Sequence, residues 1–151
     1  MIRILVFLVV ALAANGVQAS DARWLLQTSV FTSHYNPKPE HNNHQELVGL
    51  EYTRDDEWLM GGASFLNSFS QRSLYVYTGR RFDLGDGPLF AKLTGGLMHG
   101  YRGEYDDKIP LNRFGVAPAI VPALGIKGDV LSSELSFLGA AAILVSLGVQ
   151  F

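Results

Sequence analysis

Residues 143–151 read ILVSLGVQF and form the most regular stretch of the chain. Apolar side chains alternate there with smaller or more polar ones, which predicts a β-strand with one apolar face. A final strand of this kind that ends in phenylalanine, here Phe151, is the pattern that outer-membrane assembly machinery recognises. The alternative at this point is a buried edge strand of a soluble β-sandwich.

Seven further stretches predict strands of similar length, close to the roughly 9–11 residues that a tilted membrane strand needs. They are residues 23–33, 45–54, 58–67, 73–83, 89–100, 113–126 and 129–138. Their connections alternate between tight turns and longer polar loops, as the two ends of bacterial barrels do. Because eight is an even number, both chain ends fall on the same side. The sequence therefore predicts an all-β fold, an eight-stranded antiparallel transmembrane β-barrel.

The N-terminal segment predicts a cleaved signal peptide over residues 1–19. Arg3 supplies a positive start, residues 4–14 are almost wholly apolar but too short to span a bilayer, and Val17-Gln18-Ala19 suits signal peptidase. An uncleaved anchor is the alternative. The barrel is then expected over residues 20–151, as a monomer in the bacterial outer membrane.

Composition narrows the classes of function. The chain of 151 residues has no cysteine, so disulfides and thiolate metal sites are excluded. Without Arg3, the 12 basic residues fall to 11, against 14 acidic ones, which argues against nucleic acid as a partner.

Strand phase predicts which side chains face the lumen. Glu51, Arg80, Lys92 and Glu134 are expected inside, where two acids and two bases would neutralise one another. Interfacial aromatic side chains or ordinary packing are the two readings for Trp24, Trp58, Tyr75 and Tyr77.

The predicted inward face of residues 115–125 consists of small side chains. Either this leaves an apolar cavity shaped for an alkyl chain, or large opposing side chains fill the space, as is usual in small barrels. The residues expected around the cavity are Gly96, Met98, Gly115, Ala117, Ala119 and Leu144.

Pro118 and Pro122 lie in the same predicted strand. Proline cannot donate to a β-ladder, so two prolines in one barrel strand predict missing hydrogen bonds to a neighbour. One reading is a lateral opening through which a lipid chain enters, and the other is a local bulge near the rim.

His34 and Ser68 end the first and third predicted strands and should meet at the outer rim. A histidine base beside a serine hydroxyl suits acyl transfer. The loop histidines His41 and His44 lack a metal-ligand spacing and are interpreted as polar loop surface.

Several segments, in order along the chain, resemble the PagP family of lipid A palmitoyltransferases. Ser33-His34-Tyr35-Asn36 resembles that family's Ser-His-Tyr-Asp segment in the first outer loop. The other similar segments are Gly61-Gly62, Phe65-Leu66-Asn67-Ser68-Phe69, Ile109-Pro110-Leu111, residues 118–125 with their two prolines, and Gln150-Phe151.

The resemblance implies an enzyme that moves a palmitoyl chain from a glycerophospholipid donor to a hydroxyl of the lipid A acceptor, without a cofactor or metal. The family's essential histidine, aspartate and serine correspond to His34, Asn67 and Ser68. Asn67 is a departure, because an amide cannot act as a carboxylate, although it can orient a histidine or donate to an oxyanion. Glu104, Asp106 or Asp107 are the alternative sources of the charge.

Two competing functions share the fold. The first is a non-catalytic barrel with an adhesion, stress or structural role, which leaves the small inward face and the paired prolines unexplained. The second is a pore, which ranks last because eight strands leave too narrow a lumen for solute flow.

Overall fold

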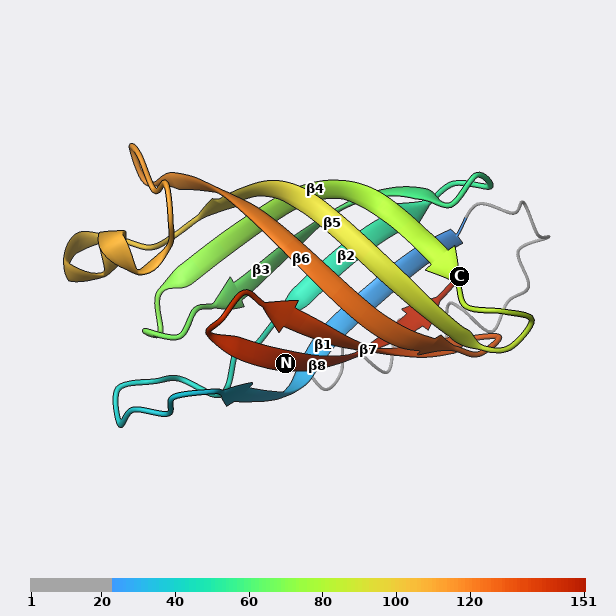
Figure 1. Ribbon diagram of the computed structural model, residues 1–151, viewed down its shortest axis with the longest axis horizontal. Coiled ribbons are helices and arrows are strands. Elements are labelled where there is room, and N and C mark those ends of the chain that lie inside the picture. Colours follow the sequence, from blue (N-terminus) through green and yellow to red (C-terminus); the bar gives the residue numbers. More distant parts are fainter. Residues whose placement is uncertain (1–22) are drawn as a thin grey trace.

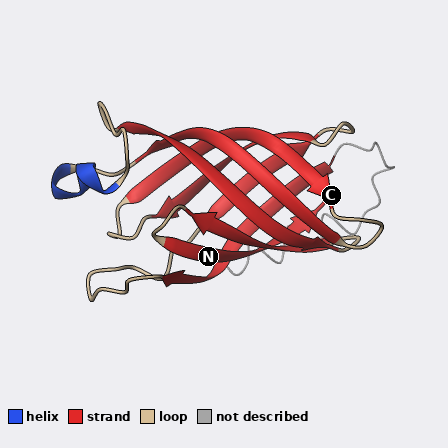
Figure 2. Cartoon of the chain, viewed as in Figure 1, coloured by secondary structure: helices blue, strands red, loops and turns tan. Residues whose placement is uncertain are grey.

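The computed structural model describes residues 23–151, and the predicted signal peptide and its cleavage site lie outside them. Eight strands pair in sequence order and close into an antiparallel barrel, which confirms the predicted fold (Figure 1). The strands are β1 (Arg23–His34), β2 (Val48–Thr53), β3 (Trp58–Leu66), β4 (Arg72–Asp83), β5 (Leu89–His99), β6 (Val116–Lys127), β7 (Leu131–Leu138) and β8 (Ala142–Gln150). One 3₁₀ helix, η1 (Gly103–Lys108), lies between β5 and β6 (Figure 2).

The two ends of the barrel differ (Figure 1). The turn end, on the right, carries Phe151 and the short connections 54–57, 84–88 and 128–130. The loop end, on the left, carries the longer connections 35–47, 67–71 and 100–115, together with the short 139–141. The barrel closes where β1 pairs with β8, from Leu25 opposite Gln150 to His34 opposite Ala142.

Three predicted strands began too early. Residues 129–130 belong to the turn before β7, residues 45–47 to the loop before β2, and residues 113–115 to the loop before β6. Backbone conformation explains the starts of β2 and β6: Glu46, Phe114 and Gly115 have φ values of 45°, 58° and 78°, in a left-handed region that a strand cannot use.

The outer face is apolar and follows the predicted phase on β2, β5 and β6. Leu50, Leu93, Leu97, Ile120 and Leu124 are all exposed on it. An apolar outer face over a partly polar interior is the arrangement of transmembrane barrels. The described part of the chain contains no helix that is long and apolar enough to cross a membrane.

The predicted phase of β4 was wrong. Tyr75, Tyr77 and Arg81 are buried inside, while Leu74, Val76 and Arg80 face outward. A shift of one residue moves every side chain of a strand to the other face. The two tyrosines are therefore not interfacial, and Arg81 takes the place predicted for Arg80.

Candidate functional site

A bulge in β1 points His34 into the mouth of the barrel. Val30 and Phe31 are 55% and 57% exposed, so two successive side chains face outward, and the pairing with β8 shifts register between Ser29 and Phe31. Bulges re-aim the side chains that follow them. After this bulge Thr32 and His34 are buried inside, at the loop end.

His34 contacts a side chain at each ring nitrogen. Its Nε2 lies 2.7 Å from Ser68 Oγ, and its Nδ1 lies 2.8 Å from Asn43 Oδ1. The amide oxygen only accepts, so Nδ1 carries the proton and Nε2 accepts one from the Ser68 hydroxyl. A nucleophile, a base and a group that orients the base thus lie in sequence, the arrangement that activates a serine.

The structure brings His34 and Ser68 together as predicted, but it does not bring Asn67 to His34. Asn67 Oδ1 accepts from the backbone N–H groups of Phe69 (2.9 Å) and Gln71 (3.1 Å). Its Nδ2 donates to Ser73 Oγ at 3.1 Å. The Asn67 side chain therefore shapes the turn between β3 and β4, and the orienting role belongs to Asn43.

Sequence reasoning missed Asn43 because it lies in a stretch, 41–44, that looks like ordinary polar loop. The loop folds back over the mouth and is held there by backbone contacts. Asn42 N–H donates to Ser68 O at 2.7 Å, and Gln45 O accepts from Leu66 N–H at 2.6 Å. The buried Thr32 hydroxyl also donates to Gln45 Oε1. Only these long-range contacts place Asn43 on His34.

A second imidazole ring packs against His34. The His41 ring lies 4.3 Å from that of His34, and the edge of Phe69 meets His41 at 5.8 Å. Burial and the neighbouring His34 lower the pKa of His41. Glu104, Asp106 and Asp107 lie on or beside η1, and none of them is hydrogen-bonded to His34 among the contacts of residues 23–151. No cluster of three or more potential metal ligands occurs within the same range.

Large side chains occupy the middle of the lumen. The rings of Tyr75 and Tyr77 stack at 4.8 Å and pack with Leu59 against Met98, Ala119 and Val121. A Cβ on Gly96 would lie 2.7 Å from Tyr77 Cα. At this level the second reading holds: large side chains of β4 fill the space that the small residues of β6 leave, and the expected alkyl-sized cavity is absent here.

The other expected cavity residues are placed as follows. Ala117 is fully buried inside, and Leu144 packs in a second cluster with Leu47 and Ala63. Gly115 lies outside β6, where a Cβ would meet the His99 ring at 3.6 Å.

One wall of the barrel is unpaired towards the loop end. β6 pairs with β5 along its whole length, but its pairing with β7 stops at Ala123 opposite Ser136. Lys127 N–H donates to Pro88 O on the β5 side. Because N–H directions alternate along a strand, even-numbered positions, including Pro118 and Pro122, face β7. Both prolines thus withhold the hydrogen bonds that would close this gap, as predicted.

A second interruption lies beside the bulge. β1 pairs with β2 only as far as Thr28 opposite Val48. Beyond this point a groove of about 190 Å³ is lined by residues 29–31 and 43–46. The loop that carries Asn43 forms one side of it.

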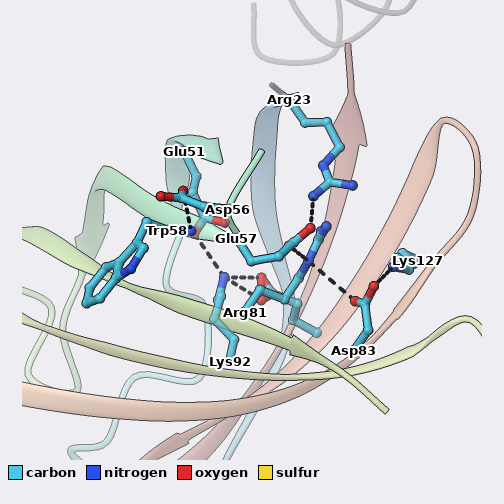
Figure 3. A network of polar contacts seen from close by, with 10 residues as sticks. Arg23, Glu51, Asp56, Glu57, Trp58, Arg81, Asp83, Lys92 and Lys127 are labelled. Atoms are coloured by element: carbon cyan, nitrogen blue, oxygen red, sulfur yellow. Dashed lines mark hydrogen bonds and ion pairs between the residues drawn. The ribbon is translucent and has the colours of Figure 1, made fainter. Parts of the chain in front are cut away.

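A network of charged side chains fills the lumen at the turn end (Figure 3). Lys92 Nζ donates to Glu51 Oε2 at 2.9 Å and to Glu134 Oε1 at 2.6 Å, and all three residues are buried. Arg81 donates to Glu57 Oε2 at 2.9 Å, and Arg23 donates to the other oxygen of that carboxylate at 2.7 Å. The predicted pairing is confirmed for Lys92 with Glu51 and Glu134. The second internal base is Arg81 rather than Arg80, and it pairs with Glu57 and not with these two acids.

Comparison with known proteins supports the architecture. No family model matches the chain, and no curated protein does. Among solved structures, the chain is similar to a de novo designed transmembrane β-barrel, with a TM-score of 0.51 and 10% identity over 86% of this chain and 92% of that one. This likeness shows the fold alone, a β-barrel of the transmembrane kind.

Proposed function

We propose that the protein is an outer-membrane acyltransferase that moves a palmitoyl chain from a glycerophospholipid to a hydroxyl of lipid A. The observation that carries the proposal is the Asn43–His34–Ser68 sequence of hydrogen bonds at the loop end, in which the His34 side chain is buried. The resemblance of residues 33–36 and 65–69 to the lipid A palmitoyltransferases supplies the donor and the acceptor.

The chemistry needs a base and an activated hydroxyl. As Ser68 Oγ attacks the donor's ester carbonyl, its proton passes to His34 Nε2. The imidazolium then protonates the departing lysophospholipid oxygen, which leaves an acyl-serine. The lipid A hydroxyl next attacks that ester while His34 takes its proton, and the same proton returns to Ser68. No cofactor is required, because the acyl chain arrives as an ester.

The unpaired wall between β6 and β7 supports entry from the membrane plane. Unsatisfied backbone in lipid is costly, and it is tolerated where it lines an opening. A chain entering beside Pro118 would meet Met98 and Ala117 first, and the stacked tyrosines would stop it from going deeper. Selection of chain length would therefore depend on how deep a chain can reach before it meets Tyr75, since transfer from bilayer to lumen gains little hydrophobic free energy.

The filled middle of the lumen favours one other function, a non-catalytic barrel with an adhesion, stress or structural role. A dense interior is what such a protein needs. It leaves the His34–Ser68 hydrogen bond and the interrupted β6–β7 ladder without a purpose.

Mass spectrometry of lipid A from cells with and without the gene tests the proposal. We expect one added palmitoyl group that disappears in His34→Ala and Ser68→Ala. His44→Ala is the matched control, because this exposed histidine lies in the same loop as Asn43 and should leave the added group in place. An unchanged lipid A profile with the wild-type barrel correctly inserted would favour the non-catalytic function.

A further inference from the structure

Arg80 lies on the apolar outer face of the barrel at its turn end, on the right in Figure 1. The residue belongs to β4, near the end of that strand at Asp83, and its side chain is exposed. Trp58 lies directly opposite it in the β3–β4 ladder, and Leu93 lies opposite it in the β4–β5 ladder. Both neighbours are exposed on the same face. Arg80 is therefore a cation among side chains that face lipid.

The surroundings of Arg80 are those of a bilayer interface rather than of the bilayer centre. Trp58 is the first residue of β3, so Arg80 lies beside the turn at residues 54–57. Trp24, Trp58 and Phe82 are all exposed on the outside at this end. A band of aromatic side chains of this kind lies at the level of the lipid headgroups. The Arg80 guanidinium is thus within reach of phospholipid phosphates.

Arg80 has no carboxylate partner among residues 23–151, unlike the other cations of the turn end. Each of those is paired with an acid: Arg23 and Arg81 with Glu57, Arg54 with Asp56, Lys92 with Glu51 and Glu134, and Lys127 with Asp83. Arg80 instead contacts the Phe82 ring, whose centroid lies 5.6 Å from its Cζ. This contact orients the guanidinium but leaves its N–H groups free to bind an anion from outside the chain.

Arg72 offers a comparison within the same strand. It lies on the same outward phase of β4 as Arg80, at the loop end, and it is also exposed. Its Nη2 lies 3.6 Å from Glu46 Oε2. The chain therefore supplies an acid to the outward arginine at the loop end and none, within the described residues, to the outward arginine at the turn end.

We propose that Arg80, Trp58 and Phe82 bind the phosphate of an anionic glycerophospholipid in the leaflet at the turn end. The guanidinium fork matches two phosphate oxygens, and the Phe82 ring holds the cation in place. The Trp58 indole lies where the glycerol ester groups would be, and its N–H is a further donor. A zwitterionic lipid carries an ammonium group that competes for its own phosphate, so a lipid with net negative charge, such as phosphatidylglycerol, binds better.

This site is separate from the proposed acyl transfer. His34 and Ser68 lie at the loop end, whereas Arg80 lies outside the barrel at the turn end. Arg80→Gln should therefore leave the modification of lipid A unchanged. Failure of the acyl-transfer proposal would leave the lipid site standing, and failure of the lipid site would leave the acyl-transfer proposal standing.

Fluorescence quenching tests the lipid site, because Trp24 and Trp58 are the two tryptophans of the chain. Full-length protein carrying Trp24→Phe is placed in mixed vesicles of phosphatidylglycerol and phosphatidylcholine. Bromine on the acyl chains of one lipid, and then of the other, gives their relative affinity beside Trp58. One basic contact at an anionic membrane surface corresponds to about a fivefold preference. We expect about that preference for phosphatidylglycerol, and a ratio of about one after Arg80→Gln is added.

Two controls show whether the effect is local. Arg72→Gln removes the same charge from the same strand and should keep the preference. Trp58→Phe leaves Trp24 as the reporter on β1, which β2 and β3 separate from β4, and there Arg80→Gln should leave the ratio unchanged. Heat-modifiable gel migration confirms that each variant forms a barrel. The inference is overturned if Trp58 reports no preference, if the preference survives Arg80→Gln, or if Arg72→Gln removes it equally.

Discussion

Val30 and Phe31 are neighbours in the chain, and both point out of the barrel. The β8 ladder skips Val30, since Ser29 pairs with Ser146 and Phe31 pairs with Val145. The inward-facing side chains of β1 therefore fall on odd-numbered positions before the bulge and on even-numbered positions after it. The inward orientation of the His34 side chain, on which the site depends, requires this extra residue.

Deletion of Val30 should leave the site intact, because the strand then reaches His34 in the same phase and register without a bulge. Deletion of Ser33 should turn His34 outward and lower acyl transfer to the level of His34→Ala. Activity is compared after both variants are shown by heat-modifiable gel migration to form barrels. If the two deletions have equal effects, phase does not control the site.

Lys92 neutralises two buried carboxylates, so Lys92→Met should leave Glu51 and Glu134 facing each other unpaired. Breaking a buried ion pair in this way costs about 3–5 kcal/mol of unfolding free energy. Urea unfolding in lipid vesicles measures it. Arg80→Met is the control on a neighbouring strand, because Arg80 is exposed and should change the free energy by less than about 1 kcal/mol. Equal losses would show that the internal network is not what stabilises the turn end.

Gly96 and Gly95 are adjacent but face opposite environments. A Cβ on Gly96 would lie 2.0 Å from Val76 O, whereas a Cβ on Gly95 would have no neighbour within 4 Å. Gly96→Ala should therefore destabilise the barrel by about 1–3 kcal/mol through overpacking. Gly95→Ala should be neutral or slightly stabilising. Reversed effects in the same unfolding assay would contradict the close packing of β4 and β5.

Replacement of Pro118 and Pro122 by threonine restores two N–H groups that face β7. We expect the β6–β7 ladder to extend and the unfolding free energy to rise by about 1 kcal/mol per hydrogen bond formed. Acyl transfer should fall severalfold if lipid enters through this wall. Pro88→Thr, in a turn at the other end, is the control and should leave transfer unchanged. A closed ladder with full activity would exclude this route of entry.

The close approach of the His34 and His41 rings predicts an acid-sensitive loop. The pKa of His41 is lowered in the folded protein, so the unfolded loop binds a proton more readily than the folded one. The stabilising contribution is complete above the ordinary histidine value of about 6.5 and declines as the pH falls below it. The His41 amide donates to Lys38 O at 3.0 Å, and its protection from hydrogen exchange, measured relative to the intrinsic rate at each pH, should therefore be lower at pH 5 than at pH 7. His41→Phe keeps a ring and removes the charge, and it should abolish this loss of protection.

Much of the barrel could be predicted from the alternation of apolar and polar side chains along the sequence. All eight strands were predicted, and the outward faces of β2, β5 and β6 were correct, because each strand carries most of its large aliphatic side chains on one phase. β4 misled because both of its phases are apolar or aromatic: Leu74 and Val76 alternate with Tyr75 and Tyr77. Tyrosine occurs at membrane interfaces, and it also occurs inside a lumen where its hydroxyl has a hydrogen-bond partner. Here the Tyr77 hydroxyl donates to Glu51 Oε2 at 3.0 Å.

Sequence alone determined the fold and the distinction between its turn end and its loop end. It also predicted that His34 and Ser68 meet, because the strand ends that precede them lie at the same rim. The tertiary structure decided which residues complete the site. Asn43 comes from a loop whose path depends on contacts with the turn at residues 67–71, and no local periodicity encodes such contacts. It also decided that the lumen is filled at its middle, since side chains of β4 occupy the room that the small residues of β6 leave.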